Sequence, residues 1–439
     1  MKKTLLASAF MLASVAMYAQ TEVVVVEECC TAPVAVVPEG DQGVRFIDTD
    51  KNSQVYDIMQ ANAPNDALLK DAPRFALVGK NSKFYLGIGA NVMLVGDFDW
   101  GHPISNANKF TTSDIPMSIE KGDGGQFQFS AAQSDFYLNF VGLPGSDNQI
   151  GVFLDVNFMN GSHNPALHHA YVKYRGITAG HTLSIFTDNG ARAASIDYEG
   201  PNAYTFMGHP NISYTGKFGK DRLWSAAIGL DMPEFTGTFS ENLNRTVSQR
   251  VPDIPVYLQR GWCGGKGYLR ASAIFRTLTY RDLKADKNEN VLGWGVKLSG
   301  RTPICGGLSA MWEGVYGQGI ASYIQDLTNK GMDLVPDKEN NGKMEGVKAW
   351  AAYGTLQYVV CPRVMLNATY SQVRTYANDW NNTSWNQLYK WAQYVTANCF
   401  VRVNSFTQVG AEYLYGRRKD FGGMQAHDNR ISLMLKVSL

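Results

Sequence analysis

The sequence predicts an all-β protein, a 16-stranded antiparallel transmembrane β-barrel with an N-terminal periplasmic extension. Three observations support this fold class. Apolar and polar residues alternate with a period of two in runs long enough to cross a membrane. Long and short gaps alternate between these runs. Charged residues make up only 18% of the chain, below the roughly 25% of a typical soluble domain, and no internal run of 18 apolar residues indicates a membrane helix.

Residues 1–19 have the features of a secretory signal peptide. Lys2 and Lys3 precede an apolar stretch, and Ala19 provides the small residue that signal peptidase needs before the cut. No cysteine stands at this junction, which argues against a lipoprotein anchor. The sequence therefore predicts export across the inner membrane.

Residues 20–82 are predicted to form a periplasmic extension that is partly disordered. Val55, Ile58 and Met59 would share one face of a short helix within it. No sustained heptad pattern indicates a coiled coil. Whether this segment plugs or braces the barrel stays open.

Residues 83–439 are predicted to form the barrel. Successive side chains on a strand face opposite sides, so each alternating run places apolar residues toward lipid and polar residues inward. About ten residues, at about 3.3 Å each and a tilt near 40°, cover the roughly 25 Å apolar band of an outer membrane. The sixteen predicted strands are 84–95, 126–140, 149–159, 165–175, 177–186, 211–217, 222–232, 254–260, 267–279, 290–300, 307–319, 348–360, 363–373, 392–403, 405–416 and 429–439. The alternation slips within 126–140, which predicts a bulge.

The gaps between the predicted strands set the topology. The first gap, 96–125, is long and the second, 141–148, is short, and the later gaps continue this alternation. Outer-membrane barrels have long external loops and short periplasmic turns. Both ends of the barrel segment are therefore expected on the periplasmic side.

Several ionisable residues have the parity opposite to the lipid face. A bare charge in the bilayer is costly, so these side chains are expected to face water or one another. The residues predicted to line the pore are Asp155, His169, Lys173, Arg270, Arg276, Lys297, Glu313, Arg402 and Glu412. Such a wall would carry a transverse field that orients polar solutes. The alternative is a set of structural ion pairs inside a plugged barrel.

The third long gap, 187–210, is predicted to fold inward and narrow the pore. It contains Arg192, Asp197, Glu199 and His209. The alternative is an ordinary exposed loop.

The sequence contains little that indicates an enzyme, a metal site or a nucleic-acid-binding protein. His168 and His169 are adjacent, so on a regular strand they face opposite sides and cannot hold one ion. We therefore predict no metal site and no cofactor. No Gly-x-Ser-x-Gly or His-Glu-x-x-His motif indicates a hydrolase, and a net charge of +1 argues against nucleic-acid binding. A disulfide between Cys263 and Cys305 stays open.

Several short motifs, in order along the chain, resemble motifs of the DcaP-like trimeric porins of Gram-negative outer membranes. They are His169-Ala170-Tyr171-Val172, Ala179-Gly180-His181-Thr182, Asp197 with Gly200-Pro201, Pro252-Asp253-Ile254-Pro255, Tyr316-Gly317-Gln318-Gly319-Ile320, and Glu412-Tyr413 with Arg417-Arg418. The resemblance covers roughly residues 83–439 and implies a homotrimer in the outer membrane. The chain departs from the pattern at Gly208 and Ser213, where basic residues are expected.

The function predicted from these features is that of an outer-membrane porin. It would stand among outer-membrane lipids and pass small hydrophilic solutes by passive diffusion, without being an enzyme. The five inward-parity bases and the resemblance together predict a mild preference for anionic metabolites. The alternative is a structural or adhesive barrel with a closed lumen. The preferred solute is not encoded in any pattern that the sequence shows.

Overall fold

The computed structural model describes residues 45–49, 53–64, 73–161, 164–337, 341–376 and 387–439. All described residues belong to one compact unit, Gly43–Leu439. The predicted signal peptide lies outside the described residues.

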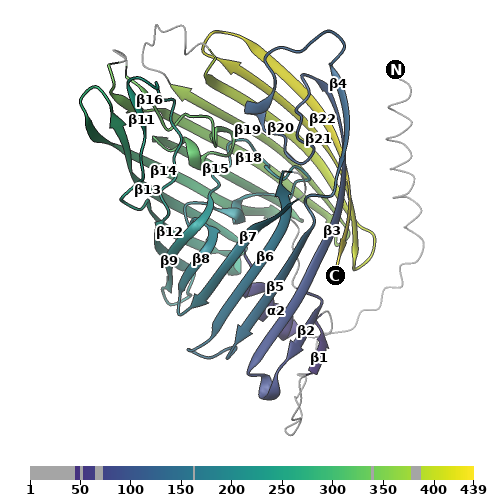
Figure 1. Ribbon diagram of the computed structural model, residues 1–439. Coiled ribbons are helices and arrows are strands. Elements are labelled where there is room, and N and C mark those ends of the chain that lie inside the picture. The colour runs from purple at the N-terminus through teal and green to yellow at the C-terminus, as the bar shows by residue number, and fades with distance from the viewer. Residues whose placement is uncertain (1–44, 50–52, 65–72, 162–163, 338–340, 377–386) are drawn as a thin grey trace. The chain divides into compact units, whose positions relative to one another are not determined.

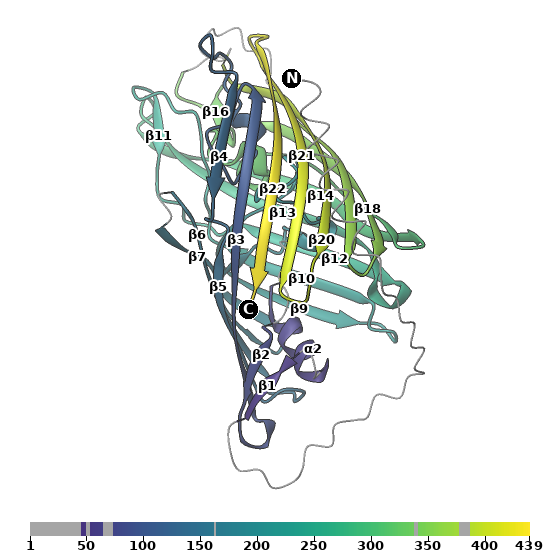
Figure 2. The ribbon, with the colours of Figure 1, turned by 90° about the vertical axis from the view of Figure 1, so that its right-hand side faces the viewer.

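The described unit is a closed antiparallel β-barrel of sixteen strands (Figure 1). The barrel strands are β3 (Phe84–Gly101), β5 (Asp135–Gly142), β6 (Ile150–Asn160), β7 (Asn164–Tyr174), β8 (Ile177–Leu183), β9 (Gly208–Phe218), β10 (Trp224–Asp231), β12 (Ile254–Trp262), β13 (Gly267–Asp282), β14 (Lys287–Cys305), β15 (Leu308–Gln318), β18 (Lys348–Cys361), β19 (Val364–Tyr376), β20 (Tyr389–Arg402), β21 (Thr407–Asp420) and β22 (Gln425–Ser438). Each strand pairs with the next along the chain. The seam is made by β22 and β3, from Asp428 opposite Gly101 to Ser438 opposite Asn91, and these strands lie side by side in Figure 2.

Each of the sixteen predicted strands corresponds to one strand of the barrel. The alternation slip predicted within 126–140 is found as a break between β4 (Gly125–Ser130) and β5. The C-terminal part of β3, from Val95 to Trp100, pairs with β4, and its N-terminal part, from Phe84 to Asn91, pairs with β5. The largest differences are in length: β14 exceeds the predicted 290–300 at both ends, and β3 continues to Gly101.

One of the shortest connections is the two-residue turn between β7 and β8. Arg175 and Gly176 both have positive φ angles, 47° and 82°. A two-residue hairpin of the type whose twist matches that of the strands requires this at both central positions, and glycine adopts it without steric cost. The turn therefore fixes the register in which the two strands pair.

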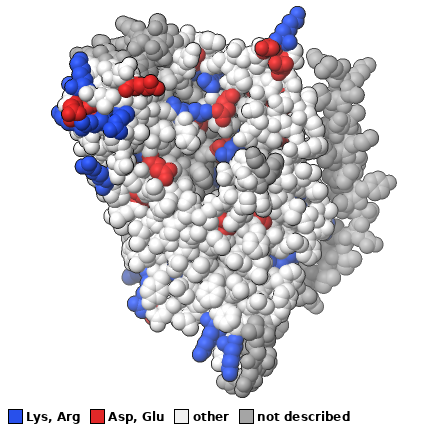
Figure 3. Space-filling model, in the orientation of Figure 1, with Lys and Arg blue, Asp and Glu red and all other residues white. Residues whose placement is uncertain are grey.

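The outer surface of the barrel is apolar, as the alternation predicts. On β14, Leu292, Val296 and Leu298 are exposed, whereas Lys297 between them is 2% exposed. Figure 3 shows that the part of this face over β5–β9 carries few charged side chains, with several Lys and Arg gathered below it. This is the distribution that a lipid-facing wall requires. None of the helices in the described part of the chain combines the length and apolar character needed to cross a bilayer.

Three elements precede the barrel: β1 (Arg45–Asp48), α2 (Ser53–Asn62) and β2 (Phe75–Val78). Strand β2 pairs with β1 and with the start of β3. Helix α2 includes the predicted helical positions, and its Val55 and Met59 pack against Tyr85 and Val141. Because Tyr85 and Val141 face inward, the helix lies against the inner wall at the end of the barrel that carries the short turns.

The remaining elements belong to turns and loops. They are η2 (Lys80–Ser82), η3 (Thr112–Asp114), η4 (Asn189–Ala191), β11 (Asn244–Thr246), η5 (Cys263–Gly265), η6 (Ala321–Tyr323), η7 (Gln325–Leu327), β16 (Leu334–Pro336) and β17 (Met344–Gly346). The largest hydrophobic cluster joins loop residues such as Phe186, Tyr204 and Tyr323 to inward residues of the wall. The packed core of this barrel is therefore formed by loops inside it.

Candidate functional site

Three long loops fold into the barrel and meet one another. They are loop 1 (102–124), loop 3 (184–207) and loop 6 (319–347). The backbone N–H of Phe110 donates to Asp197 Oδ1 at 2.9 Å, which joins loop 1 to loop 3. The hydroxyl of Thr112 donates to Asp326 Oδ2 at 2.6 Å, which joins loop 1 to loop 6. The lumen is therefore shaped by a connected set of loops.

Carboxylates on the wall hold loop 3 in place. Glu412 on β21 accepts hydrogen bonds from Ser195 Oγ and from the backbone N–H of Asp197, each at 2.8 Å. Glu313 on β15 accepts from the backbone N–H of Thr205 at 2.7 Å. An ionised carboxylate forms stronger hydrogen bonds than a neutral acceptor, so both ends of this stretch are firmly attached.

Lys297 on β14 completes the attachment at Thr205. Its ammonium group lies 3.1 Å from Glu313 Oε2 and donates to Thr205 Oγ1 at 2.7 Å. It also donates to the carbonyl oxygen of Phe186 at the start of loop 3. Lys297 thus joins both ends of the loop to the wall.

Arg276 on β13 holds loop 6 in a similar way. Its guanidinium pairs with Asp253 at 2.8 Å and with Asp333 of loop 6 at 3.1 Å, and all three side chains are buried. It also donates to the carbonyl oxygen of Gly319 at 2.8 Å. Two carboxylates and a carbonyl compensate for the burial of this charge.

These contacts revise the predicted pore-lining set. All nine residues have inward parity, but six of them are at most 2% exposed: Asp155, His169, Arg276, Lys297, Glu313 and Glu412. Arg276, Lys297, Glu313 and Glu412 bond to the folded loops. Because all six are buried, they do not face open water, which corrects the expectation that they line the pore. Lys173 and Arg270 are half-buried, and Arg402 is exposed. The structural ion pairs considered as the alternative are thus present beneath the loops.

The predicted constriction-loop residues also differ in their surroundings. Arg192 donates to the carbonyl oxygen of Tyr198 at 2.9 Å and lies over the ring of Tyr204. Glu199 forms an ion pair with Lys109 of loop 1 at 3.0 Å. Both side chains thereby fix the shape of loop 3.

His209 lies outside the loop. The structure ends loop 3 at Met207, and His209 is on β9, with Nε2 3.3 Å from Asp231 Oδ2. The predicted segment 187–210 therefore extends too far at its C-terminal end, because the strand that follows begins at Gly208.

Asp197 is the loop 3 residue with the most perturbed acidity. Burial and, to a smaller extent, the neighbouring Glu412 charge raise its pKa to about 7, although the hydrogen bond from the N–H of Phe110 opposes the shift. Tyr394 also donates to its Oδ2 at 3.0 Å. The carboxyl group therefore changes charge within the physiological pH range.

Residues of loop 3 line three of the cavities. A cavity of about 620 Å³ lies among the extracellular loops, and one of about 400 Å³ lies at the end with the short turns. A third cavity, of about 10 Å³, lies between loop 3 and the wall. It shares Asn189 and Arg192 with the lower cavity and Phe206 and Gln325 with the upper one. Among these three cavities, the one between loop 3 and the wall is the smallest.

The lower cavity is lined by basic residues. Within the described part of the chain, its lining includes no aspartate or glutamate. The basic side chains are Arg192, Arg301, Arg363, Arg402 and Lys436. Like charges gathered around one space create a positive potential there.

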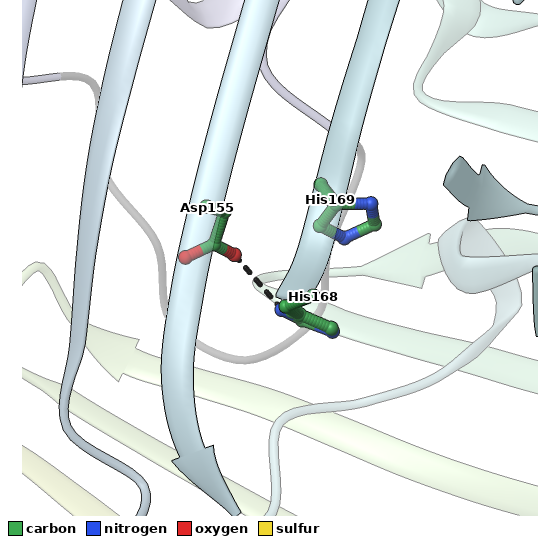
Figure 4. Close-up of side chains that lie close together, drawn as sticks. All are labelled: Asp155, His168 and His169. Atoms are coloured by element: carbon green, nitrogen blue, oxygen red, sulfur yellow. Dashed lines mark hydrogen bonds and ion pairs between the residues drawn. The ribbon is translucent and has the colours of Figure 1, made fainter. Parts of the chain in front are cut away.

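A bulge in β7 overturns the expectation that His168 and His169 face opposite sides. Asp155 on β6 pairs with His169, while the next residue, Val156, pairs with Leu167, so His168 is an extra residue. The two imidazole rings lie 4.2 Å apart, and His168 Nδ1 lies 2.8 Å from Asp155 Oδ2 (Figure 4). The sequence did contain a sign of this bulge. Outward residues of a regular strand are two positions apart, whereas the outward residues Leu167 and Ala170 are three positions apart.

The sequence did not point to Asp326 and Asp333 of loop 6, or to Asp253 directly before β12, as site residues. Asp253, Asp326 and Asp333 are all buried. Burial raises the pKa of Asp326, which accepts hydrogen bonds from Thr112 and Tyr389. Parity applies only to strands, so the sequence held no signal for loop residues that turn inward.

The thiols of Cys263, Cys305, Cys361 and Cys399 are free. Cys263 and Cys305, the pair considered for a disulfide, are both exposed in turns at the same end of the barrel.

Comparisons with known proteins agree with this architecture. The family model described as "Porin subfamily" matches residues 141–431. The outer membrane channel DcaP of Acinetobacter baumannii has 18% sequence identity and a TM-score of 0.68, covering 82% of this chain and 99% of that chain. An anion-selective porin from Comamonas acidovorans has 10% identity and a TM-score of 0.52, covering 81% and 100%. OmpF of Salmonella typhi, in complex with daunomycin, has 13% identity and a TM-score of 0.50, covering 81% and 98%. No curated protein sequence matches the chain.

Proposed function

Because this chain belongs to the porin subfamily and so forms a passive channel in the outer membrane of a Gram-negative bacterium, we propose that it is a narrow, mildly anion-preferring pore with its constriction at loop 3. The observation that carries the proposal is the order of the three cavities, wide, narrow and wide, with the narrow one beside Arg192.

The attachment of loop 3 supports its role as the constriction. Glu412 and Glu313 hold the loop from two well-separated strands, so it crosses the lumen instead of standing above it. A loop fixed at both ends presents a narrow opening of constant width. Solutes are then selected by size and by the charge of the residues beside that opening.

The charges around the lower cavity support the anion preference. Five basic side chains surround this space, whereas the upper cavity has Lys109 together with Glu199 and Glu234. A basic chamber next to a narrow passage raises the local concentration of anions and lowers that of cations. The preference is expected to be mild, because ions of physiological salt screen charges within about 8 Å.

The outer edge of the barrel supports assembly into a homotrimer. Strand β4 pairs with β3, and no other described strand pairs with it. Phe127 and Phe129 on this strand are 60% and 66% exposed. A free strand edge is not tolerated in hydrocarbon, so a second copy of the chain would cover it.

Conductance of the purified protein in planar lipid bilayers tests the proposal. Stable single-channel steps are expected, and in a salt gradient the reversal potential should have the sign of anion preference. A reversal potential of the opposite sign, which indicates cation preference, would contradict the proposed selectivity but not the channel function.

A structural or adhesive barrel with a closed lumen is the second candidate. The specific observation in its favour is the small size of the middle cavity, about 10 Å³, which is room for about one water molecule. Absence of any conductance from correctly folded protein would favour this second function.

A further inference from the structure

We propose that Asp155, His168 and His169 form a binding site for a zinc-class divalent cation on the inner wall, beside the constriction. The three side chains each offer one ligand atom, and these atoms all lie within 4.8 Å of one another. The site extends the proposed function, since His168 lines the small cavity beside loop 3 and a metal bound here would border the proposed constriction.

The bulge in β7 is what makes the site. On a regular strand only one of two adjacent histidines faces inward, but the extra residue turns both rings to the same side as Asp155. The ring of His169 is 4.2 Å from the ring of His168, and Figure 4 shows both next to the carboxylate of Asp155. Bulges recur near functional sites because they redirect side chains in this way.

Two imidazoles and one carboxylate are a set of ligands that zinc and its neighbours prefer. Catalytic zinc sites often use three such protein ligands and keep a fourth position for water. Ligand atoms of a tetrahedral site, at about 2.0–2.1 Å from the metal, lie about 3.3 Å apart. His168, whose side chain is 11% exposed, is the ligand with room to move inward and close the distance.

The surroundings supply the two other features of a metal site. Thr182 Oγ1 lies 3.0 Å from His169 Nδ1, a contact that fixes the ring and directs Nε2 to the metal. His168 lines the cavity of about 10 Å³, which holds about one water molecule. That water would take the fourth position and would face the solutes that pass.

Titration of the intact, detergent-solubilised protein with Zn²⁺, and with Co²⁺ as a spectroscopic probe, tests the site. The wild type should bind one equivalent, with Co²⁺ absorption typical of nitrogen and oxygen ligands. His168→Gln should abolish binding, and Thr182→Val should weaken it by about tenfold, as loss of an outer partner does. The control is His427→Gln on β22, an exposed histidine far along the chain from this cluster, which should bind as the wild type does.

Conductance provides the second measurement. Zn²⁺ should lower the single-channel conductance of the wild type and of His427→Gln, and leave that of His168→Gln unchanged. Binding by the wild type without any conductance would refute the channel and keep the metal site. Failure of the wild type to bind Zn²⁺, or equal binding by His168→Gln, would overturn the site whatever the conductance shows.

Discussion

At the scale of single residues, inward charge in this barrel has two different uses. The wall residues at most 2% exposed, such as Glu412 and Lys297, hold loops by hydrogen bonds to loop backbone and side chains. Arg402, one of the basic residues around the lower cavity, is exposed and therefore accessible to solutes. Parity separates lipid-facing from inward residues but does not separate these two uses.

Arg276 should be far more important for stability than an exposed arginine. Replacing it by alanine leaves Asp253 and Asp333 buried without a counter-charge, and breaking a buried pair typically costs about 3–5 kcal/mol. Thermal unfolding of the variant should occur at a clearly lower temperature. Arg260→Ala is the matched control, because its pair with Asp221 is solvent-exposed and should contribute little to stability. Equal losses for the two variants would contradict this reading.

Arg402→Glu should shift the reversal potential toward cations. The change reverses one of the five basic charges around the lower cavity. An interaction of roughly 1 kcal/mol with a passing ion corresponds to about a fivefold change in the permeability ratio. Lys220→Glu, in an exposed turn outside that cavity's lining, should have little effect. A shift of equal size in both variants would show that the lower cavity does not control selectivity.

At the scale of elements, the inward loops depend on one another and on the wall. Loop 3 is held by loop 1 through Asp197, and loop 6 is held by loop 1 through Asp326. Helix α2 is a fourth inward element, fixed at its last residue: Asn62 donates to Asn139 Oδ1 at 2.7 Å. The mobility of one of these elements should therefore affect its neighbours.

Docking of loop 3 should weaken as the pH rises. The pKa of Asp197 is raised from 3.8 to about 7 in the folded protein, so the folded state binds the proton more tightly. Its contribution to stability is complete below pH 3.8 and is lost as the pH rises through about 7. The charged groups that act on Asp197 are Glu412, Glu199 and Arg430. Loop-dependent current fluctuations should therefore be more frequent at pH 8 than at pH 5.

The control for this pH dependence is the uncharged variant. Asp197→Asn should make the fluctuations nearly independent of pH over the same range, because no proton is then gained or lost at this position. Glu120→Gln, an exposed change in loop 1, should keep the wild-type response. A full pH response in Asp197→Asn would place the titrating group elsewhere.

Gly151→Ala should release the end of helix α2. A Cβ added at Gly151 would lie 1.9 Å from Asn62 Oδ1, so the asparagine must leave its position. The carbonyl oxygen of Asn62 would then also lose the hydrogen bonds from Tyr171 and Lys173. Hydrogen exchange of residues 53–62 should become faster, and Asn62→Ala should have the same effect.

The matched control is Gly354→Ala, where an added Cβ meets no atom within 4 Å. Exchange in the helix should stay at the wild-type rate. Unchanged exchange in Gly151→Ala would show that Asn62 does not fix the helix.

At the scale of the whole molecule, the β4 edge should determine oligomer formation. Replacing Phe127 and Phe129 together by alanine removes the exposed rings beside this edge. The fraction of protein that migrates as an oligomer in unheated gels should fall. The control is Leu292→Ala with Val296→Ala, an equally exposed change on β14, which is paired on both sides. A similar loss from the control would indicate a general effect of lipid-face polarity.

The strands could be predicted from the sequence, because lipid outside and water inside impose a period of two. Even the short runs 211–217 and 254–260 were identified and correspond to β9 and β12. The interior of the barrel could not be predicted in the same way. Ser195 and Glu412 are bonded across 217 positions of the chain, and no local pattern encodes such a contact. The β7 bulge was missed because parity was counted without its pairing partner.

The seam between β3 and β22 has a consequence for how the protein is made. Strand β3 is the first strand of the barrel, and it also pairs with β2, β4 and β5. Its pairing with the last strand, β22, can form only after the whole barrel segment has been synthesised. Contacts between distant parts of a chain form slowly, since the intervening segment must first be brought together. Until β22 has formed, β3 therefore lacks its seam partner, and a chain that ends before β22 could not close the barrel.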